Sequence, residues 1–187
     1  MNPSTSSAPG LSCICLTGFM GSGKSTVGAR LAERLGWAFV DLDAEIVRTQ
    51  GQAIAEVFRN QGEAHFRQVE HEALLRILNM LGGPTVIALG GGTFIQERNR
   101  DLLCQRGATT IYLSGEFAVL LERCGAEQGT RPLAQDIEEF RKLHADRQPI
   151  YRSAELTVEI GNRSPEEISS EIVATLEKRN SQSAVPE

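Results

Sequence analysis

Short apolar segments alternate along the chain with longer segments in which apolar residues recur every three or four positions. Short continuous apolar runs are typical of strands that are buried on both faces of a sheet. Strands that alternate with helices favour one parallel sheet flanked by helices on both faces, which is an α/β fold. We expect five strands, at residues 12–17, 39–41, 85–89, 109–113 and 156–160.

Helical spacing of apolar residues is most regular between residues 63 and 81. We expect Pro149 to end the helix before it, because proline cannot continue the helical hydrogen bonding. Pro165 is typical of a first helical position, with Ser164 as the preceding cap. The predicted helices cover residues 24–35, 53–59, 63–81, 97–105, 117–124, 136–148 and 165–178.

The composition, with 41% apolar and 23% charged residues in a chain of 187, is typical of one globular domain. We place that domain at residues 12–179, between a disordered Ser/Pro-rich leader (1–11) and a flexible tail (180–187). A net charge of −5 disfavours broad nucleic-acid binding, and no apolar run is long enough to span a bilayer. The leader lacks the basic start and apolar core of a secretory signal, so we expect a cytoplasmic protein.

The first predicted strand is followed by GFMGSGKST (residues 18–26), which fits the phosphate-loop pattern G-x-x-x-x-G-K-[ST]. Glycines let the backbone curl so that several N–H groups point at phosphate oxygens, and the next helix adds its positive N-terminal end. Lys24 is expected to reach the β- and γ-phosphates, and the Ser25 hydroxyl to ligate Mg²⁺. The chain shows no NKxD-type segment that would read guanine, which disfavours a GTPase.

Two carboxylates, Asp41 and Asp43, come directly after the second predicted strand. Alternation along a strand would place both on one side of the chain, at the sheet edge where ligands bind in open α/β folds. One could bind Mg²⁺ or its waters, and the other could accept the proton of a substrate hydroxyl. The alternative is a polar turn in which Asp43 caps the following helix.

Arg67 and Glu70 lie three positions apart on a predicted helix, so their side chains can meet. The pair is either an ordinary surface ion pair or a carboxylate site in which Glu70 orients Arg67 toward a substrate. Gly90, Gly91 and Gly92 end the third predicted strand. Three consecutive glycines suggest close approach of the backbone to a ligand, although a loose turn would also explain them.

These features together resemble the shikimate kinase family, from about residue 13 to residue 176. The matching segments, in order, are GFMGSGKSTVG (18–28), FVDLD (39–43), IAEVF (54–58), GEAHFRQVE (62–70), ALGGGT (88–93), RPLA (131–134) and RQPIY (147–151). The resemblance implies a three-layer fold like that of the nucleoside monophosphate kinases, with a substrate-binding subdomain near residues 41–70 and a mobile lid near residues 125–135. It also implies MgATP-dependent phosphorylation of the 3-hydroxyl of shikimate.

The resemblance implies roles for the acceptor side as well. Asp43 would bind shikimate hydroxyls and is the candidate base, while Asp41 would lie near Mg²⁺. Two arginines would bind the shikimate carboxylate. The implied substrate-binding residues are Asp43, Phe58, Phe66, Arg67, Glu70, Gly90, Gly91, Gly92 and Arg147, with the two phenylalanines forming the apolar wall.

On the nucleotide side, the resemblance implies that Arg131, in the lid, closes over the phosphates and stabilises the charge in transfer, as arginine fingers do. Arg123 and the segment of Arg163 and Pro165 would flank adenine. The implied nucleotide-binding residues are Gly21, Ser22, Gly23, Lys24, Ser25, Thr26, Arg123, Arg131 and Arg163.

Two other readings share part of this pattern. A gluconate kinase would have the phosphate loop but need not have the set formed by Asp41, Asp43, Arg67 and Arg147. A protein that binds ligand or partner without catalysis is disfavoured by the presence of Lys24, Asp43 and Arg131. The expected partners are therefore shikimate and ATP, with no nucleic acid and no membrane, and the protein is expected to be a monomer.

Overall fold

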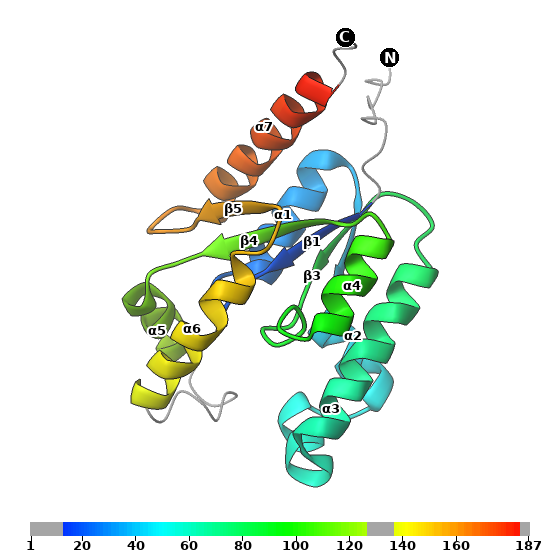
Figure 1. Ribbon diagram of the computed structural model, residues 1–187, viewed down its shortest axis with the longest axis vertical. Coiled ribbons are helices and arrows are strands. Elements are labelled where there is room, and N and C mark those ends of the chain that lie inside the picture. The colour runs from blue at the N-terminus through cyan, green and yellow to red at the C-terminus, as the bar shows by residue number, and fades with distance from the viewer. Residues whose placement is uncertain (1–12, 127–136, 184–187) are drawn as a thin grey trace.

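A computed structural model describes residues 13–126 and 137–183 of the chain (Figure 1). The five strands are β1 (Cys13–Thr17), β2 (Ala38–Asp41), β3 (Thr85–Ala88), β4 (Thr109–Ser114) and β5 (Leu156–Glu159). They form one parallel sheet in the order β2-β3-β1-β4-β5. The predicted α/β fold with five parallel strands is therefore confirmed.

The helices cover both faces of this sheet, which gives three layers (Figure 1). Helices α1 and α7 pack together on one face, and α3 and α4 lie side by side on the other. All five residues of β1 are buried, as expected for a central strand covered from both sides. The helices are α1 (Lys24–Leu35), α2 (Leu42–Gln50), α3 (Ile54–Asn79), α4 (Glu97–Gln105), α5 (Phe117–Ala126), α6 (Ile137–Tyr151) and α7 (Pro165–Ser183).

Helix α2 is absent from the helices predicted above, and α6 and α7 run past their predicted ends at residues 148 and 178. Pro149 does not end its helix but lies inside the last turn of α6, which continues to Tyr151. The Tyr151 ring is fully buried and stacks against Tyr112, so packing in the core stabilises the extra turn despite the proline. Helix α7 likewise runs past the predicted end at residue 178, to Ser183.

The break predicted between two helices near residue 60 does occur. Gly62 has φ 81° and ψ 170°, which is not helical, so α3 consists of two helical runs that meet at a kink. Only glycine adopts this backbone conformation without strain. The kink starts a new helical run just before Arg67.

The sheet order places the candidate site. Since all strands are parallel, their carboxyl ends lie at one edge, where β2 leads into Asp41, β1 into the phosphate loop and β3 into the three glycines. Strand β1 lies at the centre of the sheet, with β3 and β2 on one side and β4 and β5 on the other. The order of the strands therefore reverses at β1, and open α/β sheets bind ligands at such a point. Within the described ranges, no helix is long and apolar enough to cross a membrane.

Candidate active site

The phosphate loop has the backbone that its glycines predict. Gly18, Gly21 and Gly23 have φ values of 147°, 78° and 80°, and Gly23 is the N-cap of α1. A Cβ atom on Gly21 would lie 2.7 Å from the carbonyl oxygen of Leu120. The loop therefore needs glycine both for its left-handed turns and for its contact with α5.

Lys24 lies across this loop. Its Nζ donates hydrogen bonds to the carbonyl oxygens of Gly18 (3.0 Å) and Phe19 (3.1 Å). The first turn of α1 contains no acidic side chain, so nothing there neutralises the positive N-terminal end of the helix. Ser25 and Thr26 lie in the first turn of that helix and are exposed to solvent. Curled backbone, ammonium and helix end together form a place for an anion such as a phosphate chain.

Asp41 and Asp43 are placed differently from the strand alternation expected above. Helix α2 begins at Leu42, so only Asp41 belongs to β2, and Asp43 lies in the first helical turn. The helix cap is Asp41, whose carboxylate accepts a hydrogen bond from the backbone N–H of Ala44 (3.0 Å). The Asp43 carboxylate points toward the glycine segment, because a Cβ atom on Gly90 would lie only 2.6 Å from its Oδ1.

The Arg67 guanidinium is bound by carboxylates on two edges. Nη1 donates to Glu70 (2.9 Å), while Nε and Nη2 donate to Oε1 of Glu63 (3.2 and 3.1 Å). Burial alone would lower the pKa of Arg67, but the two carboxylates outweigh that effect and raise it, so the group stays charged. The guanidinium also lies over the rings of Phe58 and Phe66, at 5.8 and 5.4 Å from their centroids.

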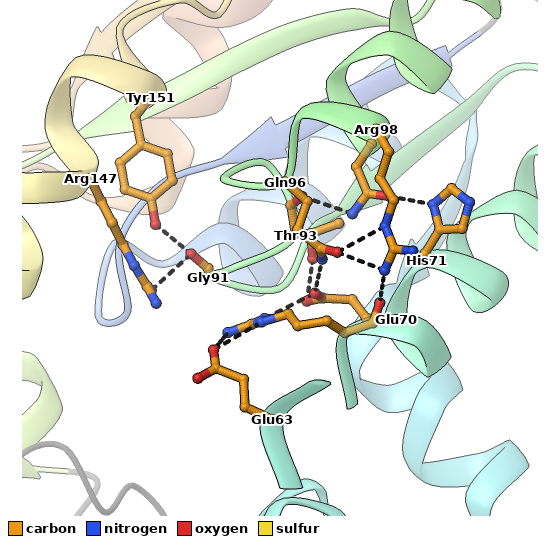
Figure 2. A network of polar contacts seen from close by, with 11 residues as sticks. Glu63, Glu70, His71, Gly91, Thr93, Gln96, Arg98, Arg147 and Tyr151 are labelled. Carbon is orange, nitrogen blue, oxygen red and sulfur yellow. Dashed lines mark hydrogen bonds and ion pairs between the residues drawn. The ribbon is translucent and has the colours of Figure 1, made fainter. Parts of the chain in front are cut away.

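Gly92 and Gly91 bring the two arginines to one short segment. The guanidinium of Arg67 lies against Gly92, where an added Cβ atom would overlap it. The carbonyl oxygen of Gly91 accepts hydrogen bonds from Nη1 of Arg147 (3.2 Å) and from the hydroxyl of Tyr151. Figure 2 shows Arg147 and Tyr151 approaching Gly91 from one side and the Glu70 cluster lying on the other.

The same glycine segment borders the phosphate loop. A Cβ atom on Gly91 would lie 3.8 Å from the backbone nitrogen of Met20 and 4.0 Å from the carbonyl oxygen of Gly18. Two guanidinium groups, the carboxylates of Asp43 and Glu70 and an anion-binding loop are therefore gathered around one stretch of backbone. Such a site can hold a small organic anion beside a nucleotide.

The family model for shikimate kinase matches residues 20–177. The chain belongs to the shikimate kinase family. Its members include the shikimate kinase of Nitrobacter winogradskyi, which is 42% identical over 169 residues that cover 89% of this chain and 77% of that one. The shikimate kinase of Aquifex aeolicus is 37% identical over 88% of this chain and 95% of its own length.

Solved structures agree with this assignment. A shikimate kinase from Acinetobacter baumannii in complex with shikimate matches with a TM-score of 0.87 at 34% identity, over 95% of this chain and 98% of that one. A gluconokinase from Sinorhizobium meliloti matches with a TM-score of 0.61 at 22% identity, which shows a shared fold alone. As a member of the shikimate kinase family, the protein is an ATP-dependent kinase.

The residues expected to flank adenine lie near one another in this family member. Nη2 of Arg123, on α5, donates to the carbonyl oxygen of Gly161 (3.0 Å), just before Arg163. Arg163 itself donates to the Glu159 carbonyl oxygen (2.9 Å) and pairs with Glu171 of α7. The guanidinium of Arg163 is thus directed at the sheet end and at α7. Arg131, the expected lid arginine, lies outside the described residues.

The residues expected near Mg²⁺ fit a hard cation, because a serine hydroxyl and an aspartate carboxylate are the oxygen ligands it prefers. No group of three His, Cys, Asp or Glu side chains that could hold a metal is found in the part of the chain that the structure describes. In proteins that bind nucleotides, Mg²⁺ commonly takes only one or two protein oxygen ligands and completes its shell with phosphate oxygens and water. Ser25 and Asp41 could supply those ligands.

Several residues of the site were not identified from the sequence. Tyr151 binds the Gly91 carbonyl oxygen, and burial raises the pKa of its hydroxyl to about 12, so it stays protonated and can donate. The segment RQPIY contains this tyrosine and could have pointed to it. Thr93 and Gln96 both donate to Glu70, at 2.6 and 2.7 Å, and carry no sequence signal of their own.

Proposed function

We propose that the protein transfers the γ-phosphoryl group of ATP to the 3-hydroxyl of shikimate, giving shikimate 3-phosphate and ADP. The observation that carries this proposal is the placement of Arg67 and Arg147 against the adjacent residues Gly92 and Gly91, beside the phosphate loop. Planar guanidinium groups bind a carboxylate in two-point fashion, and shikimate carries one carboxylate.

The donor is held by residues of the phosphate loop. Backbone N–H groups of residues 21–26 bind the phosphate oxygens, and Lys24 turns from the loop carbonyls toward the β- and γ-phosphates. The two loop carbonyl oxygens that accept from this ammonium, at 3.0 and 3.1 Å, are neutral, whereas the phosphate oxygens are charged and bind an ammonium more strongly. Mg²⁺, held by Ser25 and by Asp41 directly or through water, would neutralise charge on the phosphates.

Arg67 and Arg147 hold the acceptor through its carboxylate, and Asp43 acts on the hydroxyl that attacks the phosphate. Phosphoryl transfer depends on positioning and charge stabilisation more than on covalent chemistry of the protein. Asp43 accepts a hydrogen bond from the attacking hydroxyl and takes its proton. Its position next to Gly90, in the same glycine segment that contacts the phosphate loop and Arg67, supports that role. Phe58 and Phe66, whose ring centroids lie 4.4 Å apart, form the apolar wall.

Closure completes the site. We assign the substrate-binding subdomain to residues 41–70 and the lid to residues 125–135, within a single domain at 12–179. Arg131 enters with the lid and stabilises the charge in transfer, while water is excluded. We further propose that the enzyme is a cytoplasmic monomer. The described cysteines form no disulfide, which is the usual state in a reducing compartment.

A coupled assay of ADP release tests the proposal. The purified protein is given MgATP with shikimate, with gluconate, or with no acceptor. Shikimate should stimulate ADP release strongly, and gluconate should leave it at the level seen without acceptor. A stimulation by gluconate alone, or equal rates in all three reactions, would contradict the proposal. Detection of shikimate 3-phosphate by mass spectrometry confirms that phosphate moved to the acceptor rather than to water.

A further inference from the structure

A chain of buried and half-buried polar contacts lies behind Arg67, with Glu70 and Thr93 among its most buried members. Thr93 is fully buried and Glu70 is 1% exposed. The Thr93 hydroxyl donates to Oε1 of Glu70 (2.6 Å), and Nε2 of Gln96 donates to Oε2 (2.7 Å), the oxygen that also accepts from Arg67. Each carboxylate oxygen of Glu70 therefore receives a neutral donor from the segment that follows the three glycines.

Asn99 anchors that segment. The Asn99 side chain is fully buried, and its Nδ2 donates to the carbonyl oxygen of Thr93 (2.9 Å). Its Oδ1 lies 2.7 Å from Nδ1 of His71, the residue next to Glu70 on α3. An amide oxygen only accepts, so Nδ1 of His71 carries the proton in this pair. Figure 2 shows His71, Thr93, Gln96 and Arg98 beside Glu70, and Glu70 in turn accepts from Arg67.

Arg98 connects the same segment to Arg67 by a second route. Its Nη2 donates to the backbone carbonyl oxygen of Arg67 (2.7 Å), and its Nη1 to Oε1 of Gln68 (2.8 Å). The segment from Thr93 to Asn99 is thus bound to α3 at the backbone of the arginine and at the carboxylate that holds its guanidinium.

These contacts fix the plane of one buried carboxylate. A glutamate side chain has rotatable torsions, and Glu70 alone would not define where the Arg67 guanidinium lies. With a neutral donor from this segment on each oxygen, the carboxylate has one orientation, and the paired guanidinium is set against Gly92. A fully satisfied buried network of this kind gives rigidity, and rigidity lowers the cost of binding.

We propose that Thr93, Gln96 and Asn99 are positioning residues for substrate binding, acting through Glu70 on the carboxylate-binding Arg67. The inference rests on the proposed function, because it concerns the affinity for shikimate. A positioning role and a purely structural role can be told apart by the quantity that a substitution changes. A structural connection would change only thermal stability, whereas a positioning role changes the KM for shikimate and leaves the KM for ATP alone.

The test compares Thr93→Val with Thr93→Ser. Valine keeps the shape and removes the hydroxyl, while serine keeps the hydroxyl. We expect a roughly tenfold rise in the KM for shikimate in the valine variant, as for loss of a hydrogen bond to a charged group. The KM for ATP should be unchanged, and the serine variant should be close to wild type. Thr175→Val, which removes an exposed hydroxyl of α7 bound to Glu171, is the matched control and should change nothing.

Gln96→Leu provides a second variant at a partly exposed position, in case Thr93→Val fails to fold. It should also raise the KM for shikimate selectively. Unchanged KM for shikimate in the folded variants, or equal changes in both KM values, would overturn the inference. Equal impairment in the valine and serine variants would do the same. If the wild-type protein shows no shikimate-dependent ADP release, the proposed function itself fails, which is a different result from wild-type activity with unaffected variants.

Discussion

The donor and acceptor sides of the site are built in different ways. On the donor side, one continuous segment, residues 18–26, provides backbone, ammonium and helix end. On the acceptor side, the groups come from four separate parts of the chain: Asp43 of α2, Arg67 of α3, the segment of three glycines after β3, and Arg147 of α6. The donor side is a local structure, and the acceptor side exists only when the whole domain is folded.

This difference indicates where specificity lies. Backbone amides and a lysine recognise phosphate in any nucleotide, so the donor side is generic. The acceptor side places two fixed guanidinium groups and one carboxylate at set positions, so it can reject an acceptor of the wrong shape. Substitutions on the donor side should therefore reduce turnover, and those on the acceptor side should change the KM for shikimate.

The largest effect is expected from Lys24→Ala on the donor side. Loss of the ammonium removes charge stabilisation of the transferring phosphoryl group, and kcat should fall by about 10³-fold. The measurement is steady-state ADP release at saturating shikimate. Lys178→Ala, at an exposed position of α7, is the control. Normal turnover in Lys24→Ala would refute the assigned role.

Arg67→Ala should give the largest effect on the acceptor side. Removing one partner of a charged contact typically costs a few kcal/mol, so the KM for shikimate should rise roughly 100-fold. ATP binding, measured separately by calorimetry, should stay near the wild-type value. A variant that lost ATP affinity and kept the KM for shikimate would show that this arginine belongs to the donor side.

Gly92→Ala tests how closely the glycine segment contacts the arginine. The added methyl group would overlap the Arg67 guanidinium and displace it, so kcat/KM for shikimate should fall about tenfold. Gly82→Ala is the matched control, because no atom lies within 4 Å of a Cβ placed there. If both variants behave alike, the contact at Gly92 has no role in binding.

The smallest effect is expected from Glu63→Gln. Glu63 occupies the Nε and Nη2 edge of Arg67, the edge that a substrate carboxylate would use for two-point binding, and its side chain is 66% exposed. Glu63 therefore competes with the substrate carboxylate for Arg67. Neutralising Glu63 should weaken its hold on the arginine and lower the KM for shikimate about twofold, as for an exposed ion pair. Glu72→Gln, at an exposed position of the same helix, is the control. A higher KM in Glu63→Gln would show instead that Glu63 helps to orient the arginine.

The sequence was most informative where structure is local. The glycines of the phosphate loop and the kink at Gly62 depend on backbone conformations that only glycine adopts easily, so their residue types reveal them. Helix α2 (Leu42–Gln50) was not among the predicted helices, because it follows the strand directly and Asp41 serves as both strand end and helix cap. Pro149 was misjudged, because burial of Tyr151 outweighs the local preference of proline.

The network behind Arg67 could not be found from the sequence. Thr93 and Gln96 meet Glu70 across 23 and 26 residues of chain, and Asn99 meets His71 across 28. A threonine and a glutamine in a loop are compatible with an ordinary polar turn, and a single asparagine inside a helix indicates no partner. Only the packing of α4 against α3 brings them to one buried carboxylate.

The central claim, that both arginines bind one carboxylate of the acceptor, can be tested by comparing shikimate with its methyl ester. Rates of ADP release are measured for both compounds with the wild-type protein and with Arg67→Ala and Arg147→Ala. The account predicts that esterification strongly reduces kcat/KM with the wild-type protein and reduces it much less with either variant, because the charge contact is already lost. An equal reduction in all three proteins would contradict the account.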